Sequence, residues 1–484
     1  MKGGLVMAVL SRREFVRASL AAGAFFISGT KSTSRLLGAN DRLRVGIAGL
    51  NGRGGAHVSA FLTSPGAEIA YLIDPDTRTF AKHLGRIEKQ QGRAPICVQD
   101  VRKALEDKNL DIISIATPNH WHSLMAIWAC QAGKDVYVEK PLSHNVKEGR
   151  ILVEIARKYK RIVQHGTQSR SSRSWVELRA IVESGKLGRL LVSRGLCYKR
   201  RPSIGFKEPS PPPKELDFNI WLGPAPEQPH HGNLVHYNWH WFWDFGNGDI
   251  GNQGVHQMDI ARWMIPNATL PLAVFSIGGR FGYKDQGQTP NTQIAVFDYG
   301  PNKPLLIFEV RGLPTPPLHG QTVGNILHFE AGIVAGNKFY PADSKAEAPL
   351  PKVDVPPRAP GDIFANFLAC VRSRKVEDLH ADVLEGHYSS ALCHLANVSY
   401  RLGSDMTPAQ FRSHLRNEPH LEECLARMEE HLKENKVALS DIQYRVGRRL
   451  KVDAATETIV GDSEANQLLF RQYRQPFVVP DRVV

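Results

Sequence analysis

The sequence predicts an α/β protein whose amino-terminal part is a doubly wound parallel sheet of the Rossmann type. Three observations predict this fold. Apolar strands alternate with helical segments up to residue 165, a glycine-rich turn follows the first strand, and an acidic residue ends the second. A chain of 484 residues is too long for one small core, so we expect at least one further domain.

The first strand, residues 43–49, leads directly into the glycine-rich turn. Asn51 stands where the dinucleotide-binding pattern has its middle glycine, and asparagine tolerates left-handed backbone better than most residues. Such a turn lets backbone N–H groups approach a pyrophosphate at the start of the next helix. We therefore assign cofactor binding to Gly49, Asn51, Gly52, Arg53 and Gly54.

The second strand, residues 68–74, ends in Asp74, about 20 residues after the last turn glycine. An acid at this position binds a ribose 2′-hydroxyl and repels a 2′-phosphate, so NAD is favoured over NADP. Arg53 and Arg78 keep NADP open as the second choice, and a helix N-cap is the structural alternative for Asp74.

The remaining strands of this sheet are expected at residues 110–116, 136–138 and 162–165, with helices at 123–131 and 146–160 between them. Because ligands bind at the carboxyl ends of parallel strands, Thr117, Asn119 and His122 are candidate cofactor-binding residues. Glu139 and Lys140 end the 136–138 strand and join this group.

Lys140 is also the first candidate catalytic residue. A lysine beside the cofactor can hydrogen-bond a substrate hydroxyl and act on its proton during reversible hydride transfer. The alternative is a surface Lys-Pro turn, since Pro141 follows at once.

With the turn at 49–54, Thr117 to His122 and Glu139-Lys140-Pro141 in this order, the chain resembles the Gfo/Idh/MocA family of glucose–fructose oxidoreductase and inositol dehydrogenase. The resemblance implies a second, α+β domain with a large open, mostly antiparallel sheet that lines the substrate pocket. It also implies that Lys140 contacts the reacting hydroxyl and that a histidine of the second domain is the acid/base.

His256 matches that histidine, within the stretch from Gly248 to Asp259. Asn252 stands where many relatives carry aspartate, and asparagine can neither accept a proton nor hold a negative charge. Any proton relay through this position is therefore in doubt, although Asn252 could still orient a substrate hydroxyl. Asp259 lies one helical turn from His256 and is expected either near it or paired elsewhere.

An aromatic segment at residues 236–244 offers Tyr237, Trp239 and His240 as further substrate-binding candidates, because sugars stack on aromatic rings. Core packing is the alternative for each ring. Sheet strands are expected at 190–198, 272–280, 294–299 and 305–311, and helices at 174–184, 363–372 and 384–402. A hairpin and a helix are expected in the tail from residue 446 onward.

The amino terminus predicts export. The paired Arg12 and Arg13, followed by an apolar run at 18–27, resemble a twin-arginine signal peptide. The expected organisation is a signal peptide at 1–39, an NAD(P)-binding Rossmann domain at 40–165, a substrate domain at 166–445 and a tail at 446–484. The expected location is periplasmic or otherwise exported.

The overall composition indicates which classes of binding partner to expect. The formal charge of +13 comes from dispersed basic residues without a long block, so a cationic surface is favoured over nucleic-acid binding. The six cysteines show no close pairing, which favours free thiols over disulfides or a metal site. No later segment is long and apolar enough to span a bilayer. The expected partners are the twin-arginine translocation machinery, a sugar or polyol substrate and further copies of the chain in a homo-oligomer.

These observations predict an NAD(P)-dependent oxidoreductase that acts on a sugar or polyol hydroxyl with a tightly held cofactor. Free NAD is scarce outside the cytoplasm, which is why the cofactor would have to stay bound. The alternative is an NAD-dependent glycosidase that works by transient oxidation, elimination, hydration and re-reduction. A third possibility is a non-catalytic sugar-binding module, against which Lys140 and His256 together argue.

Overall fold

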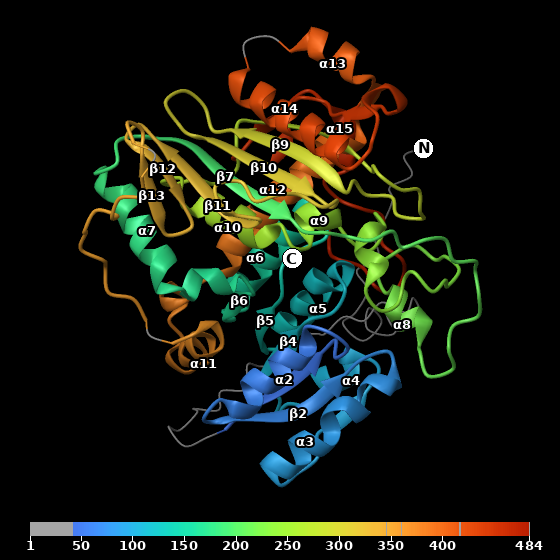
Figure 1. Ribbon diagram of the computed structural model, residues 1–484. Helices are drawn as coiled ribbons and strands as arrows, with labels where there is room; N and C mark the ends of the chain where they lie inside the picture. The colour runs from blue at the N-terminus through green and yellow to red at the C-terminus, as the bar shows by residue number, and fades with distance from the viewer. Residues whose placement is uncertain (1–41, 345, 360, 416–417, 484) are drawn as a thin grey trace, which may run out of the picture.

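The computed structural model describes residues 42–344, 346–359, 361–415 and 418–483. The signal peptide expected at residues 1–39 lies outside the described residues. Figure 1 shows the amino-terminal domain, blue to teal, on one side and the larger sheet, green to orange, on the other.

The amino-terminal domain is a six-stranded sheet in the order β3-β2-β1-β4-β5-β6, and every neighbouring pair is parallel. The predicted fold class is confirmed. The strand order reverses between β1 and β4, and this is where ligands bind in open α/β sheets. The strands are β1 (Leu43–Ala48), β2 (Ala67–Ile73), β3 (Ile96–Val98), β4 (Ile112–Ile115), β5 (Asp135–Val138) and β6 (Val163–His165).

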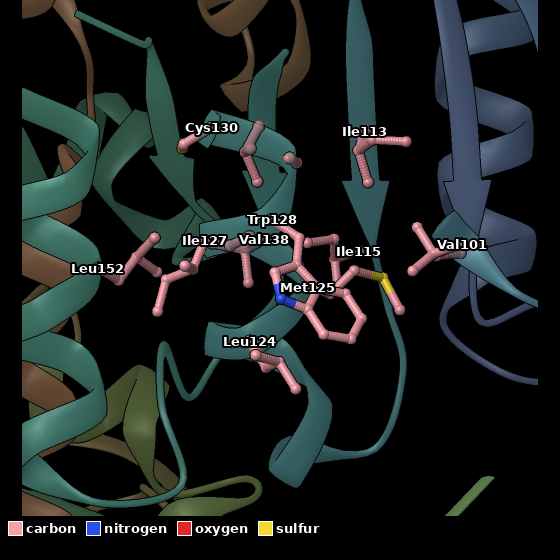
Figure 2. Packing of buried hydrophobic residues seen from close by; sticks show 14 of the residues in the cluster. Val101, Ile113, Ile115, Leu124, Met125, Ile127, Trp128, Cys130, Val138 and Leu152 are labelled. Atoms are coloured by element: carbon pink, nitrogen blue, oxygen red, sulfur yellow. The ribbon is translucent and has the colours of Figure 1, made fainter. Parts of the chain in front are cut away.

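Helices cover both faces of this sheet: α2 (Gly54–Thr63), α3 (Ala81–Gln91), α4 (Val101–Leu105), α5 (Asn119–Gln131) and α6 (Val146–Lys158). The core beneath α5 packs Trp128 and Met125 against Ile115 (Figure 2). The chain returns to this core near its carboxyl end, where Phe477 stacks edge-on against Trp121 at 5.5 Å between ring centroids.

Helix α5 begins at Asn119, whereas the sequence predicted a start at Ser123. Pro118 stands at the N-cap position, and its fixed φ and missing N–H suit the start of a helix. Asn119 and His122 therefore sit in the first turn of a helix, at the carboxyl edge of β4.

The second domain contains an eleven-stranded sheet in which β7 and β10 are parallel and the other pairs antiparallel. Its strands are β7 (Leu190–Tyr198), β8 (Ala273–Gly279), β9 (Thr292–Asp298), β10 (Leu305–Arg311), β11 (Val323–Phe329), β12 (Gly332–Ala335), β13 (Lys338–Pro341), β14 (Ser404–Met406), β15 (Tyr444–Val446), β16 (Leu450–Asp453) and β17 (Thr458–Ile459). Strands β11 to β13 were not predicted from the sequence.

The helices of this domain pack on both faces of the sheet. Helices α10 (Val255–Trp263) and α12 (Val383–Arg401) form one apolar cluster with it, and α14 (Pro419–Glu434) forms another cluster with its other face. The sheet is therefore not open along its whole width, because α14 covers part of the face expected to be free (Figure 1). The other helices are α7 (Arg173–Ser184), α11 (Ile363–Ser373), α13 (Pro408–His414) and α15 (Ser463–Gln467).

A long connection between β7 and α9 (Gly248–Gly251), residues 199–247, crosses back to the amino-terminal domain, and we call it the strap. It carries α8 (Phe218–Leu222) and the 3-10 helix η3 (Asn238–Trp241). The backbone N–H of Asp217 donates to the carbonyl of Pro75 at 2.9 Å, and the Trp121 indole donates to that of Ile220 at 3.0 Å. The strap thus ties the two domains together beside the switch point.

Within the described ranges, no helix combines the length and the apolar composition that crossing a membrane requires.

Candidate active site

A cavity of ≈ 380 Å³ lies where the switch point of the first sheet faces the second domain and the strap. It is lined by both predicted catalytic residues, Lys140 and His256. Its wall also contains all the predicted cofactor-binding residues except Gly54: Gly49, Asn51, Gly52, Arg53, Asp74, Thr117, Asn119, His122, Glu139 and Lys140.

The glycine-rich turn is built for close approach of backbone. Gly49 has φ +81°, and a Cβ there would lie 2.5 Å from the carbonyl oxygen of Ala116. A Cβ on Gly54 would lie 1.8 Å from the carbonyl oxygen of Gly49, so Gly54 lets α2 start directly against the turn. The amino end of α2 consequently borders the cavity, the geometry that suits a pyrophosphate.

Glu139 holds the glycine-rich turn in place through hydrogen bonds and an ion pair. Its carboxylate accepts hydrogen bonds from Arg53 Nε at 2.7 Å and from Gln168 at 3.1 Å, and lies 3.1 Å from His57 Nε2. Burial alone would raise the pKa of Glu139, but the contacts with His57 and Arg53 hold it well below its usual range. Glu139 therefore stays ionised and fixes the positions of Arg53 and α2.

Asp74 lies at the end of β2 with its carboxylate turned to the turn backbone. It accepts from the N–H of Leu50 at 2.8 Å and from that of Asp76 at 2.9 Å. Burial raises its pKa, although both hydrogen bonds oppose the rise. Each carboxylate oxygen keeps a further lone pair, so Asp74 can also accept from a ribose hydroxyl at the cavity wall.

Buried polar atoms without partners mark where a ligand would bind. Thr117 Oγ1 and Asn119 Oδ1 are buried and have no hydrogen-bond partner among the described residues. His122, by contrast, is fully engaged, since its ring nitrogens lie 2.6 Å from the carbonyl oxygen of Pro141 and 2.8 Å from that of Thr117. Glycines that admit a phosphate and unpartnered polar atoms beyond them fit a dinucleotide.

Lys140 and His256 reach the same cavity from different domains. Lys140 Nζ donates to the carbonyl oxygen of Asn252 at 2.6 Å, and burial lowers its pKa while the charge of Glu139 opposes this. Burial, and then the charge of Lys140, lower the pKa of His256 to about 4. His256 is therefore a neutral imidazole at pH 7, the form that accepts a proton.

The region of Asn252 contains a carboxylate that sequence reasoning missed. Asp249, three residues earlier, is buried and accepts from Arg201 Nε at 2.8 Å and Nη2 at 2.6 Å. Its negative charge opposes the lowering of the Lys140 pKa that burial causes. Asp259 pairs elsewhere, with Arg170 at 2.8 Å and 3.0 Å. The Gly248-Asp249 pair beside the predicted histidine could have drawn attention to this acid.

Some side chains of the aromatic segment line the cavity, and others pack in the core. Tyr237, 55% exposed, and Trp239 line the cavity, and the Tyr237 hydroxyl accepts from Arg201 Nη1 at 3.0 Å. His240 lies behind the cavity wall, contrary to expectation. Its Nδ1 is 2.7 Å from the carbonyl oxygen of Tyr237, and its ring packs 4.5 Å from that of Trp241. In this short 3-10 helix successive side chains point apart, which a linear reading of the segment does not reveal.

The strap contacts the amino-terminal domain at the end of the cavity bounded by Asp74, through a contact that the sequence did not suggest. His236 Nε2 lies 2.9 Å from the carboxylate of Asp76, two residues after Asp74. Both His236 and Asp74 line the cavity. A second acid after the predicted one was the only trace of this contact in the sequence.

Two family models match the chain in succession. The model described as the oxidoreductase family, NAD-binding Rossmann fold, matches residues 43–167, and that of the oxidoreductase family, C-terminal alpha/beta domain, matches residues 176–277. Residues 43–167 and 176–277 are thus similar to the two domains of the Gfo/Idh/MocA family. The family description bears out the predicted cofactor NAD.

Curated relatives match about a third of the chain. An inositol 2-dehydrogenase of Corynebacterium glutamicum is 32% identical over 165 residues, 34% of this chain and 47% of that protein. A glycosyl hydrolase family 109 protein of a Shewanella strain is 29% identical over 155 residues, 31% of this chain and 34% of that protein. The chain thus aligns with less than half the length of these relatives.

Solved structures extend the likeness to both domains. The WlbA dehydrogenase of Bordetella pertussis, solved with NADH and UDP-GlcNAcA, matches with a TM-score of 0.53 at 19% identity, covering 72% of this chain and 94% of that one. At this identity the likeness concerns the fold.

Proposed function

We propose that the protein is an NAD-dependent oxidoreductase that acts on a hydroxyl of a sugar or polyol and holds its cofactor tightly. The observation that carries this proposal is the convergence of Lys140 and His256 on one cavity beside the glycine-rich turn. The relatives named as inositol dehydrogenases support a polyol or sugar as the substrate class.

The residues divide the chemistry between them. Lys140 uses one N–H on the carbonyl of Asn252, which leaves two for a substrate hydroxyl. Its positive charge favours the alkoxide that forms as the proton leaves. His256, neutral at pH 7, accepts that proton. The residues around the glycine-rich turn and Asp74 would hold NAD, which would supply the hydride acceptor.

The strap supports cofactor retention. Contacts of Asp217, Ile220 and His236 with the amino-terminal domain place the strap against the end of the cavity bounded by Asp74. A nucleotide enclosed in this way leaves slowly, which suits an enzyme working where free NAD is scarce.

Mass spectrometry of nucleotide released from the denatured, purified protein tests the cofactor directly. We expect NAD or NADH in near-stoichiometric amount. A set of polyols and aldoses, assayed with the purified protein, should then give turnover that falls about 10²- to 10⁴-fold in Lys140→Met. The exposed Lys147→Met is the matched control and should retain wild-type activity. Equal activity of both variants would refute the assigned role of Lys140.

The glycosidase remains the second candidate, because Asn252 replaces the usual acid and one set of relatives is named glycosyl hydrolase family 109. Aryl glycosides supplied without added cofactor separate the two functions. Release of the phenol without net NADH favours hydrolysis, and net NADH without phenol favours oxidation.

We further propose export by the twin-arginine route, on the basis of Arg12, Arg13 and the apolar run at 18–27. The location would be periplasmic or otherwise exported. Replacing both arginines by lysine should leave the protein in the cytoplasmic fraction, and unchanged fractionation would contradict the route.

We also propose that the protein forms a homo-oligomer. Since α14 covers part of the large sheet, pairing between copies would use the remaining part of that face. Light scattering of the purified protein distinguishes a monomer from an oligomer.

A further inference from the structure

Two adjoining cavities lie apart from the active site and share Trp243 and Arg401 in their walls. Their volumes are ≈ 570 Å³ and ≈ 290 Å³, and neither shares a lining residue with the active-site cavity. They lie between the end of the strap, the end of α12 and the tail. Their combined lining contains four arginines, Arg280, Arg401, Arg445 and Arg471, against two aspartates, Asp244 and Asp405.

Arg401 is the unpaired member of this set. Its guanidinium lies 5.2 Å from the ring centroid of Trp243 and has no hydrogen-bond acceptor or ion pair among the described residues. Arg401 is exposed at the surface. Desolvation by the surrounding protein lowers its pKa, the charge of Asp244 opposes this, and the charge of Arg471 adds to the lowering.

The other cations of the two cavities have partners. Arg280 forms two hydrogen bonds with Asp285 at 2.7 Å and 2.8 Å. Arg445 lies 3.3 Å from Asp405, and Arg471 donates to the carbonyl oxygen of Asp244 at 2.8 Å. Among the described arginines of the two cavities, Arg401 is therefore the one whose side chain has no acceptor.

A second donor without a partner lies in the smaller cavity. Asn247 is only 5% exposed, and its Oδ1 lies 3.2 Å from His394 Nδ1. Its Nδ2 is buried and has no partner among the described residues. An amide group whose oxygen is engaged and whose N–H₂ is free needs an acceptor.

His144 supplies the third donor without a partner. Arg471 Nη1 lies 3.3 Å from His144 Nδ1 and, as a guanidinium, can only donate, so Nδ1 is the acceptor. Burial, and then the charge of Arg471, hold the pKa of His144 well below its usual range, so the ring is neutral. Its one proton is therefore on Nε2, a buried atom that lacks a partner in the described structure.

We propose that Arg401, Asn247 and His144 bind an oxyanion, the carboxylate, phosphate or sulfate group of a small molecule. These three residues, each with a donor that lacks an acceptor among the described residues, line one cavity. The excess of arginine over aspartate favours a negative charge there. Trp243 lines both cavities beside Arg401, so a ligand held by Arg401 would also lie close to the indole. The site is independent of the proposed reaction.

Isothermal titration calorimetry on the purified full chain tests this site, with inorganic phosphate, glucuronate and glucose as separate ligands at constant ionic strength in chloride. We expect saturable binding of phosphate or glucuronate that weakens at least tenfold in Arg401→Gln. Arg401→Lys should retain part of the affinity. Arg86→Gln, which removes an equal charge from a distant exposed position, should bind like wild type.

The ligands also distinguish the source of the anion. Tighter binding of glucuronate than of phosphate, with no Arg401-dependent binding of glucose, identifies an acidic sugar, and the reverse order identifies a phosphate group. Because the Arg401 side chain makes no hydrogen bond in the described structure and contacts only the Trp243 ring, its replacement should change the melting temperature little. Absence of saturable binding in wild type, or equal affinity in Arg401→Gln, would overturn the proposal.

Discussion

His256 and Asn252 both line the cavity. We expect these two residues to determine how the activity of the proposed site depends on pH. His256 has its pKa lowered to about 4 by burial and by the charge of Lys140. The side chain at position 252 carries no charge to counter this. The buried Asp249 supplies a negative charge nearby, but Arg201 neutralises it.

Replacing Asn252 by Asp should restore an anion near the imidazole. Because an opposite charge favours the protonated form, Asn252→Asp should raise the pKa of His256 by about one unit or more. The acid limb of kcat/KM would move to higher pH by the same amount. A pH–rate profile measures the shift, and Asn252→Ser is the uncharged control. An identical acid limb in both variants would place position 252 out of electrostatic reach of His256.

Sequence reasoning found the residues that belong to local patterns. The turn at 49–54, Asp74, Lys140 and His256 each follow a strand or open a helix, so their neighbours in the chain suffice to place them. Arg201 and Asp249, or His236 and Asp76, meet only in three dimensions. Such pairs cannot be recognised from a pattern in a single sequence. His240 shows the opposite case: it is close to Tyr237 in the chain, but it does not line the cavity.

Among the elements, the tail has the clearest energetic role. Phe477 is 1% exposed and packs on Trp121 and Trp128 of α5, the helix that carries Asn119 and His122. Phe477→Ala should lower the free energy of unfolding by about 3–5 kcal/mol, as measured by urea denaturation. Phe470→Ala, in the same tail but 52% exposed, should cost less than about 0.5 kcal/mol. Similar losses for both would mean that the tail does not complete the core.

The strap predicts a kinetic effect. His236→Gln removes the 2.9 Å contact with Asp76 beside the ribose side of the cavity. NADH should then dissociate about tenfold faster, equivalent to about 1.4 kcal/mol, with little change in melting temperature. Stopped-flow fluorescence of bound NADH measures this rate. His230→Gln, at a half-buried histidine of the same strap, is the control, and equal rates for both variants would argue against a closing role for His236.

Regular elements were more predictable than irregular ones. Strands β7 and β10 agree with the sequence pattern at both ends because their apolar runs are bounded by turn residues. Helices α13 and α14 were not predicted. Because α14 is rich in charged residues, the apolar face that packs against the sheet is hard to recognise from the sequence alone. The strap, with little regular structure, has no periodicity to detect.

At the scale of the whole molecule, buried neutral histidines predict sensitivity to acid. Burial lowers the pKa of His120, His165 and His394 to about 3 and of His240 and His256 to about 4. The unfolded chain takes up protons near pH 6.5 and the folded chain only at lower pH. Their contribution is therefore fully present above about pH 6.5 and is lost as the pH falls toward 4.

The free energy of unfolding should accordingly fall between pH 7.5 and pH 5, by up to about 1.4 kcal/mol per pH unit for each extra proton bound by the unfolded state, and the urea midpoint should fall with it. Titration of proton uptake on unfolding at pH 5.5 provides an independent measurement of the same quantity. A constant midpoint over this range, with no proton uptake, would mean that these rings are accessible to solvent.

The return of residues around position 477 to the first domain also bears on synthesis. On the ribosome, the groove beside α5 would stay unfilled until more than three hundred further residues, counted from the end of that helix, had been translated. Until then Trp121 and Trp128 would lack their aromatic partner, so the amino-terminal domain would complete its packing only after the end of the chain had been made.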